Sequence, residues 1–289
     1  MHCRAGPRAR FNGGKRGESL MTRYRVANSG HYFNVEIRGA GDPLVLLHGF
    51  SGDASTWRTV LGRLTEDFLC IAFDLLGHGA SDAPPDVASY RMESIAAVIV
   101  ELLERLAVMN PRLLGYSMGG RLALFLAHQY PERFGALILE SASPGLADER
   151  ARAERRRRDN KLADEIEANG VAWFVEHWEN LPLWATQSVE QVRAQRAQRL
   201  SNSPQGLANS LRGMGAGAQP NLWGQLPNLS VPTGLIVGER DDKFRRTNQA
   251  MAEAIPRSSL SIIPSAGHNT HLENPEAFCQ ALATLLPSL

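Results

Sequence analysis

Short, continuous apolar runs alternate with segments of helical apolar periodicity along most of the chain, and this alternation restricts the fold more than any other feature. The apolar runs lie at residues 43–50, 68–74, 112–115 and 136–140, and residues 233–241 and 258–268 each have the pattern of a strand followed by a loop. The helix-like segments lie at residues 57–64, 91–106, 118–129 and 274–286. Continuous apolar runs between helices are typical of buried parallel strands. The order therefore predicts an α/β fold with a mostly parallel central sheet and right-handed crossovers, with helices on both faces.

Two segments depart from this alternation. Polar and apolar residues alternate over 23–39, with turn residues at 28–30, which predicts an antiparallel hairpin ahead of the parallel strands. Residues 145–219 contain no strand-like run and are rich in arginine and tryptophan. We expect them to form a helical lid, inserted into a core made of residues 21–144 and 220–289.

The first twenty residues have a different character from the rest of the chain. They are basic and rich in glycine, and they lack the apolar segment of a secretory signal. We interpret residues 1–20 as a disordered extension or an incorrectly assigned start, with the folded chain beginning at Met21. No apolar run reaches the roughly 18 residues that a membrane helix needs, so stable membrane insertion is not expected.

Composition sets wide limits on function. A length of 289 residues fits one large domain or two small ones. The formal net charge of +1 gives no overall field that would favour nucleic acid. Cys3, Cys70 and Cys279 are an odd number without CxxC spacing, which argues against a disulfide framework or a zinc site. We expect a cytoplasmic protein, and the sequence leaves its oligomeric state open.

The segment Gly115-Tyr116-Ser117-Met118-Gly119 lies between an expected strand and an expected helix. In that context a Gly-x-Ser-x-Gly sequence is a nucleophile elbow, in which the two glycines permit a sharp turn that exposes the serine. The helix that follows places its positive dipole end beside the serine, where it favours developing negative charge. We therefore predict that Ser117 is catalytic.

Two further loops at the carboxyl ends of strands supply partners for this serine. His268 follows the last strand, comes last in chain order, and is predicted to be the general base in preference to His271. Asp241 follows the preceding strand and is predicted to orient His268, in preference to Asp242. The order Ser–Asp–His along the chain supports the three assignments together.

An oxyanion hole requires two backbone N–H groups directed at one point. The residue after the nucleophile, Met118, is expected to supply one of them. The loop after the first parallel strand, in His48-Gly49-Phe50, is expected to supply the other from Phe50. His48 is interpreted as a hydrogen-bonded loop residue rather than an acid or base.

These residues resemble the α/β-hydrolase superfamily over about residues 23–286, but membership alone does not determine the reaction. Arg121 lies four residues after Ser117, one helical turn beneath it. A surface salt bridge is the alternative role for Arg121. The lid begins with an arginine-rich run at 150–161, most of which should be solvated, although some guanidinium groups could bind carboxylates in pairs of hydrogen bonds.

A closer resemblance emerges from six segments taken together. They are HGFSGD (48–53), GYSMGGR (115–121), ESASPGL (140–146), RAERRRRD (152–159), GERDDKF (238–244) and AGHNTHLENP (266–275). The chain is similar, from about residue 24 onward and including the lid, to 2-succinyl-6-hydroxy-2,4-cyclohexadiene-1-carboxylate synthases of menaquinone biosynthesis. The first twenty residues have no counterpart in that family.

The resemblance implies a lyase with a hydrolase-like triad. Proton abstraction from 2-succinyl-5-enolpyruvyl-6-hydroxy-3-cyclohexene-1-carboxylate leads to loss of pyruvate, with Ser117 as the base, and implies no metal or organic cofactor. Matching motif positions imply a set of residues that contact this small polycarboxylate substrate. They are Arg121, Arg155, Arg199, Tyr116 and Trp178, with Arg196 as an alternative to Arg199.

Other functions remain compatible with the same residues. A serine hydrolase, either a carboxylesterase or a carbon–carbon bond hydrolase, would use the same triad. A ligand sensor with a moving lid would not need an intact triad. A dehalogenase would need an aspartate in place of Ser117.

Overall fold

The structure is a computed structural model that describes residues 19–26 and 29–288. Its centre is an eight-stranded sheet in the order β1-β2-β4-β3-β5-β6-β7-β8. The strands are β1 (Ser19–Arg25), β2 (Tyr32–Arg38), β3 (Asp42–Leu47), β4 (Phe68–Phe73), β5 (Arg112–Tyr116), β6 (Ala136–Glu140), β7 (Thr233–Gly238) and β8 (Ser258–Ile263). The helices that pack on the sheet are α1 (Arg58–Asp67), α2 (Met92–Arg105), α3 (Met118–Gln129), α7 (Asp242–Ala254), α8 (Thr270–Glu273) and α9 (Pro275–Leu285).

The sheet confirms the predicted mostly parallel arrangement. From β4 to β8 every neighbouring pair of strands is parallel, whereas β1 and β2 are antiparallel, as is the pair of β2 and β4. The predicted hairpin is present, with Arg25 opposite Tyr32, although residues 27–28 of its turn lie outside the described residues. The expected extension at residues 1–20 also lies largely outside them. Its boundary needs a correction, because β1 begins at Ser19, two residues before Met21.

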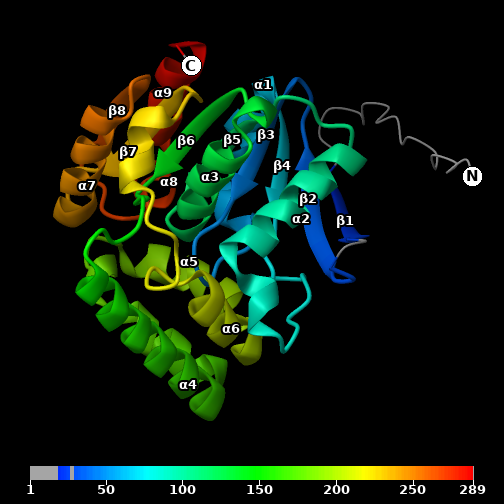
Figure 1. Cartoon of the computed structure of the whole chain (residues 1–289), viewed down its shortest axis with the longest axis vertical. Helices are drawn as coiled ribbons and strands as arrows, with labels where there is room; N and C mark the ends of the chain where they lie inside the picture. Colours follow the sequence, from blue (N-terminus) through cyan, green and yellow to red (C-terminus); the bar gives the residue numbers. More distant parts are fainter. Residues whose placement is uncertain (1–18, 27–28, 289) are drawn as a thin grey trace, which may run out of the picture.

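The inner parallel strands, from β4 to β7 in the sheet order, are buried on both faces because helices cover both sides of the sheet (Figure 1), whereas the edge strand β8 is partly exposed. In β3, Val45 and Leu47 face the core beneath α2, α3 and α7, while Leu44 and Leu46 face the core beneath α1 and α9. All four side chains are 0% exposed. A strand buried on both faces needs apolar residues at successive positions, which explains the continuous runs in the sequence.

A group of helices is inserted between β6 and β7 and lies together at one end of the sheet (Figure 1). It consists of α4 (Glu149–Glu179), α5 (Val189–Leu200) and α6 (Pro204–Met214), and we call it the cap. The cap has a small core of its own, where Ala163, Ile166 and Phe174 of α4 meet Leu207 and Leu211 of α6. The three helices lie within the stretch 145–219 that lacks strand-like runs.

Helix α7 is absent from our sequence-based predictions. Its apolar residues are few, and only Asn248 and Met251 are buried among its thirteen residues. The helix is specified at its start instead, where the side chain of Asp241 accepts a hydrogen bond from the backbone N–H of Phe244 at 3.1 Å. Its few apolar side chains do lie on one face, but the segment as a whole is polar, and our sequence analysis overlooked it.

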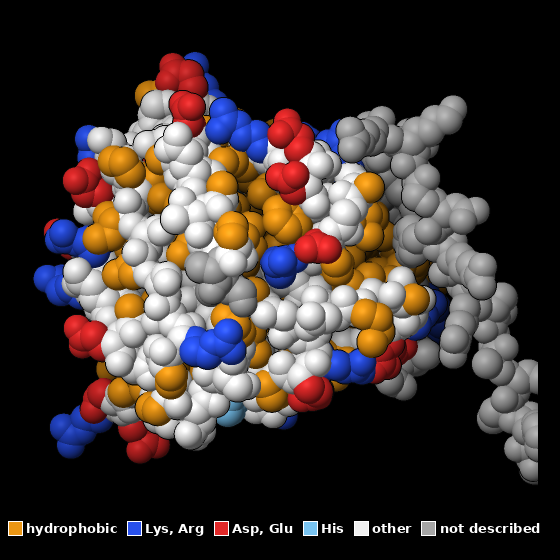
Figure 2. Space-filling model, turned by 90° about the horizontal axis from the view of Figure 1, so that it is seen from above, with side chains coloured by type: hydrophobic (Ala, Val, Ile, Leu, Met, Phe, Trp, Pro, Cys, Tyr) orange, Lys and Arg blue, Asp and Glu red, His pale blue; other side chains and the backbone are white. Residues whose placement is uncertain are grey.

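The outer surface shows no concentration of one charge at the end of the molecule opposite the cap. There, basic and acidic side chains are interspersed with apolar ones (Figure 2). Within residues 19–26 and 29–288, no helix combines the length and the apolar character needed to cross a bilayer.

Candidate active site

Ser117 occupies a strained turn between β5 and α3. Its φ of 50° and ψ of −107° lie outside the regions that a serine ordinarily adopts. Its backbone N–H donates to the carbonyl of Glu140 at the end of β6, at 2.8 Å, which fixes the turn to the neighbouring strand. A side chain at Gly119 would collide with the carbonyl of Leu47, and one at Gly115 would collide with Gly119. The sharp turn therefore requires glycine at both positions, as the elbow interpretation expects.

The loops after β7 and β8 bring a histidine and an acid to this serine. His268 Nε2 lies 3.0 Å from Ser117 Oγ, and His268 Nδ1 lies 2.7 Å from Asp241 Oδ2. His268 is 2% exposed and Asp241 8% exposed, so the row of hydrogen bonds is shielded from water. This geometry allows His268 to take the Ser117 proton while Asp241 holds the imidazole in the required tautomer.

The two competing residues are engaged elsewhere. Asp242 points outward and pairs with Arg245 at 2.7 Å. His271 is fully buried and its Nδ1 lies 2.7 Å from Glu140 Oε2. Neither contacts Ser117 or His268 through a recorded hydrogen bond, which favours the assignments made from chain order.

The two N–H groups proposed for the oxyanion hole belong to residues that line the same cavity as Ser117. Met118 is the first residue of α3, and Phe50 follows Gly49 in the loop after β3. A Cβ placed on Gly49 would lie 3.6 Å from Ser117 Cβ, so this loop passes directly beside the nucleophile. Among the described residues, no acceptor is recorded for the backbone N–H of Phe50 or of Met118. Both groups are thus available to a developing oxyanion.

A cavity of about 350 Å³ opens over Ser117 between the sheet and the cap. Arg121 and Arg155 line it, and so do Tyr116 and Trp178. Four of the five substrate-contacting residues implied by the resemblance therefore share one cavity with Ser117 and His268. Tyr116 is 5% exposed, and its burial raises the pKa of its hydroxyl well above the ordinary value.

Arg121 is half-buried and has only neutral partners. Its guanidinium donates to the Met214 carbonyl at 2.9 Å and to Gln219 Oε1 at 3.0 Å. Burial, and then the charge of Arg155, lower the pKa of Arg121 to about 10. These contacts do not support the surface salt bridge considered as its alternative role. The one acid whose charge acts in the opposite direction, Asp159, is already hydrogen-bonded to Arg155. A desolvated cation that has no acid of its own is costly unless the site receives an anion.

Arg155 is paired but remains at the cavity. Its Nε donates to Asp159 Oδ1 at 2.7 Å, one turn along α4. Because its side chain is 41% exposed whereas that of Asp159 is 6% exposed, the guanidinium extends outward from the pair. It can therefore still present N–H groups to a ligand in the cavity.

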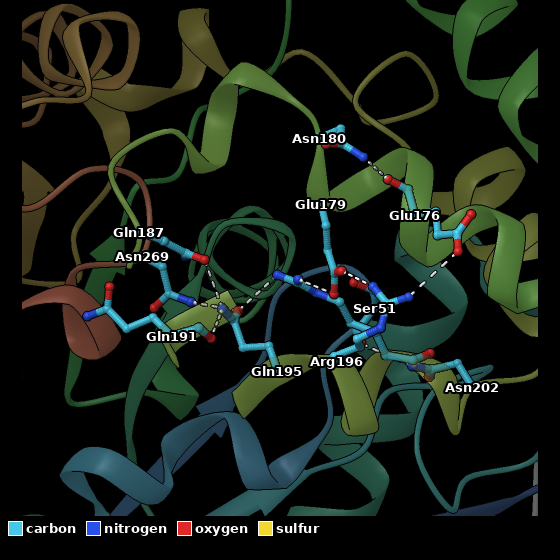
Figure 3. Close-up of polar contacts among 11 residues, drawn as sticks. Ser51, Glu176, Glu179, Asn180, Gln187, Gln191, Gln195, Arg196, Asn202 and Asn269 are labelled. Atoms are coloured by element: carbon cyan, nitrogen blue, oxygen red, sulfur yellow. Dashed lines mark hydrogen bonds and ion pairs between the residues drawn. The ribbon is translucent and has the colours of Figure 1, made fainter. Parts of the chain in front are cut away.

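Arg199 does not line the cavity over Ser117, where the family resemblance leads us to expect it. It is 3% exposed, donates to Glu179 Oε1 at 3.2 Å and to Gln195 Oε1 at 3.0 Å, and stacks over Trp184. Arg196, the alternative, also pairs with Glu179, and Figure 3 shows Arg196 and Gln195 in this polar network of the cap. Arg199 lines a neighbouring cavity of about 450 Å³ instead of the cavity over Ser117. The carboxylate of Glu179 thus neutralises Arg199 here, and a substrate role for it stays a prediction.

Two residues of the site, Lys243 and Glu140, were not predicted from the sequence. Lys243, in the first turn of α7, lines the mouth of the Ser117 cavity near Arg155. Glu140 is fully buried behind the elbow, where its carboxylate accepts from Thr270 Oγ1 at 2.6 Å and from the His271 backbone N–H at 3.0 Å. The motif GERDDKF contains Lys243, and attention to its offset from Asp241 could have identified it. An isolated glutamate at a strand end offers no comparable clue.

The strand order, the elbow and the Ser–His–Asp row define an α/β hydrolase, and the family profile described as the alpha/beta hydrolase fold matches residues 42–275. Within that class, the chain belongs to the 2-succinyl-6-hydroxy-2,4-cyclohexadiene-1-carboxylate synthase family. It is 42% identical, over 92% of its length and 96% of the relative, to a Bacillus subtilis (strain 168) protein provisionally assigned as such a synthase. It is 35% identical to the synthase of Salmonella paratyphi C (strain RKS4594), over 84% of this chain and 93% of that protein.

Solved structures support the same family. MenH from S. aureus superposes with a TM-score of 0.84 at 35% identity, covering 88% of this chain and 97% of that one. A malate-bound esterase from Thermogutta terrifontis gives a TM-score of 0.81 at 30% identity, over 93% and 98% of the two chains. The family confirmed here is the one that the six sequence segments indicate.

Proposed function

We propose that this protein is a lyase that eliminates pyruvate from 2-succinyl-5-enolpyruvyl-6-hydroxy-3-cyclohexene-1-carboxylate and releases 2-succinyl-6-hydroxy-2,4-cyclohexadiene-1-carboxylate. Its family supports this activity. The observation that carries the proposal is Arg121, which lines the Ser117 cavity without an acidic partner. A substrate with several carboxylates supplies the missing negative charge, whereas a neutral ester does not.

The reaction needs a base, an electron sink and a leaving group. The proton at C2 of the ring lies beside the succinyl carbonyl, so its removal gives an enolate. Collapse of the enolate forms the C2–C3 double bond, shifts the existing double bond to C4–C5 and breaks the bond from C5 to the enolpyruvyl oxygen. The departing enolpyruvate takes up a proton and becomes pyruvate. Carbon, oxygen and charge balance without an oxidant or a cofactor.

The site supplies what these steps require. Ser117, deprotonated by His268 at 3.0 Å, takes the C2 proton, and Asp241 stabilises the imidazolium that results. The N–H groups of Phe50 and Met118 stabilise the enolate oxygen, because preorganised donors interact most strongly with the charge that develops in the transition state. Arg121 and Arg155 bind carboxylates of the substrate, and Tyr116 and Trp178 pack against its ring.

The alternative function is hydrolysis of an ester by the same triad. Its specific support is the likeness to the Thermogutta terrifontis esterase. That structure is described as malate-bound. Hydrolysis and elimination differ in what Ser117 attacks, a carbonyl carbon or a proton.

A direct assay distinguishes the two reactions. The purified full-length protein is given the enolpyruvyl substrate, pyruvate release is followed continuously, and p-nitrophenyl acetate serves as the ester control. We expect pyruvate release with a kcat/KM at least ~10³-fold above that for the ester. Ser117→Ala and Asp241→Asn should each lower it on the order of 10⁴-fold. Ester cleavage that exceeds pyruvate release would instead make the protein a hydrolase.

A small polycarboxylate is the expected partner, and nucleic acid is not. A cytoplasmic location is supported by the free thiols of Cys70 and Cys279, since reduced cysteines are usual in that compartment.

A further inference from the structure

His48 is a buried histidine that the triad does not use, and it touches the loop that carries the proposed oxyanion donor. It follows β3 directly and is 0% exposed. Its ring makes one hydrogen bond through each nitrogen. Nδ1 lies 2.7 Å from the carbonyl oxygen of Gly49, and Nε2 accepts from the backbone N–H of Leu75 at 2.9 Å.

The two hydrogen bonds together determine which nitrogen carries the proton. The Leu75 N–H can only donate, so Nε2 must be the acceptor and must be unprotonated. The single ring proton of the neutral imidazole therefore lies on Nδ1, from which it donates to the Gly49 carbonyl. Burial lowers the pKa of His48, so the neutral form persists at physiological pH.

The Gly49 carbonyl belongs to the same peptide group as the Phe50 N–H. In a planar trans peptide the C=O and N–H bonds point in opposite directions. The structure contains no cis peptide bond among its described residues. A carbonyl turned toward the buried imidazole consequently directs the Phe50 N–H to the other side of the loop. Phe50 lines the Ser117 cavity on its own side, and the described residues provide no acceptor for its N–H.

We propose that His48 is a positioning residue that orients the Gly49–Phe50 peptide, so that the Phe50 N–H serves as an oxyanion donor. The inference rests on the proposed oxyanion hole, but it applies equally to elimination and to ester hydrolysis. A second donor helps His48 to hold this peptide: the Gly52 N–H also donates to the Gly49 carbonyl, at 3.1 Å, and closes a turn. His48 adds a link from this turn to Leu75, which follows β4, so the peptide is fixed to the neighbouring strand.

Two substitutions separate the positioning role from simple packing. The amide nitrogen of asparagine stands at the same number of bonds from Cβ as His Nδ1, so His48→Asn preserves the donor to the Gly49 carbonyl. Glutamine places its amide one bond further out, near the position of Nε2, so His48→Gln preserves the contact with Leu75 and loses the donor to Gly49. Asparagine leaves the larger gap of the two, so a role in packing alone would make His48→Asn the more damaged variant, the opposite of what the positioning role predicts.

The kinetic test uses the full-length protein and pyruvate release from the enolpyruvyl substrate. Loss of an oxyanion donor lowers kcat by about 10²- to 10³-fold in other enzymes. We expect His48→Gln to lower kcat by about 10²-fold with KM within about threefold of wild type, and His48→Asn to retain kcat within about tenfold. Thermal unfolding of the three proteins shows whether both variants fold equally well. Equal kcat losses in the two variants, or a loss confined to KM, would overturn the positioning role.

A second readout makes the outcome independent of the substrate. A fluorophosphonate probe reacts covalently with an activated serine and develops negative charge on its phosphoryl oxygen. The second-order rate of Ser117 labelling should fall in His48→Gln and recover in His48→Asn. If the wild-type protein is labelled rapidly but releases no pyruvate, the proposed lyase function fails while the inference on His48 is still tested. Equal labelling rates in all three proteins would refute the inference alone.

Discussion

The backbone N–H of Arg121 donates to the carbonyl of Ser117 at 3.0 Å, one turn along α3. The nucleophile and the cation are therefore held on one rigid helix, at a fixed offset. The guanidinium reaches the cavity wall, where its partners are a carbonyl and an amide, and both are neutral. We propose that a cation placed this way binds an anionic substrate, which the following substitution tests.

Replacement of Arg121 by alanine should lower kcat/KM by about tenfold to over a hundredfold. The reason is the loss of one charge-assisted partner, worth about 1.5–3 kcal/mol. Arg121→Lys should recover part of the loss, because it restores the charge without the planar pair of donors. Arg158→Ala is the matched control, since Arg158 lies on the exposed face of α4 and pairs with Glu154. Unchanged kinetics in Arg121→Ala would show that the substrate does not contact this residue.

The central features of the fold were predictable because they follow from burial. Continuous apolar runs such as 43–50 and 136–140 are required by strands covered on both faces, and Gly115 and Gly119 are required by the elbow. The chain order of Ser117, Asp241 and His268 then follows from the order of strands. Their catalytic roles remain predictions, which Ser117→Ala and Asp241→Asn test for the first two of these residues.

Other features depend on side-chain direction, which sequence spacing does not determine. Arg199 lies in the cap among glutamates and glutamines, and its position depends on how α5 packs against the end of α4. Glu179 is twenty residues earlier in the chain, yet its carboxylate meets both Arg196 and Arg199. Helix α7 was missed for a different reason, since its few apolar residues, which do lie on one face, stand among many polar ones.

Lys243 should assist capture of the substrate rather than its conversion. It lies at the mouth of the cavity, and burial and the charge of Arg155 lower its pKa. Lys243→Met should raise KM by a few-fold, leave kcat nearly unchanged, and reduce the dependence of kcat/KM on ionic strength. Lys161→Met is the control, because Lys161 is exposed on α4 away from the cavity. Equal salt dependence in both variants would indicate that Lys243 does not attract the substrate.

The buried carboxylate of Glu140 should stabilise the loop that carries His268. Its hydrogen bonds join Thr270 and His271 to the end of β6. The backbone carbonyl of Glu140 also accepts the N–H of Ser117. Glu140→Gln keeps the shape but presents an amide N–H to one of these donors, and a buried donor left without its acceptor costs about 1–3 kcal/mol. Urea unfolding should show this loss of free energy. Glu253→Gln, at an exposed position of α7, should change it by less than about 0.5 kcal/mol. Similar small changes in both would mean that the cluster contributes little.

His78 should make the protein less stable in mild acid. It is 1% exposed, and burial above all, with a smaller effect of the neighbouring His48, lowers its pKa from 6.5 to about 3. In the unfolded chain the same imidazole takes up a proton near pH 6.5, so below that pH the unfolded state binds more protons than the folded state. The contribution of neutral His78 to the free energy of unfolding is therefore fully present above pH 6.5. It decreases as the pH falls toward 3.

The size of this effect can be measured by removing the titrating group. One pKa unit corresponds to about 1.4 kcal/mol, and partial relaxation reduces the full difference, so we expect a loss of about 1–3 kcal/mol between pH 7 and pH 4.5. His78→Gln keeps a polar side chain but cannot titrate. Between pH 7 and pH 4.5, the free energy of unfolding of this variant should therefore fall by about 1–3 kcal/mol less than that of the wild type. His128→Gln, at a half-buried position near the end of α3, serves as the control for loss of one histidine. Parallel pH profiles of urea unfolding for wild type and His78→Gln would show that His78 is not the group responsible.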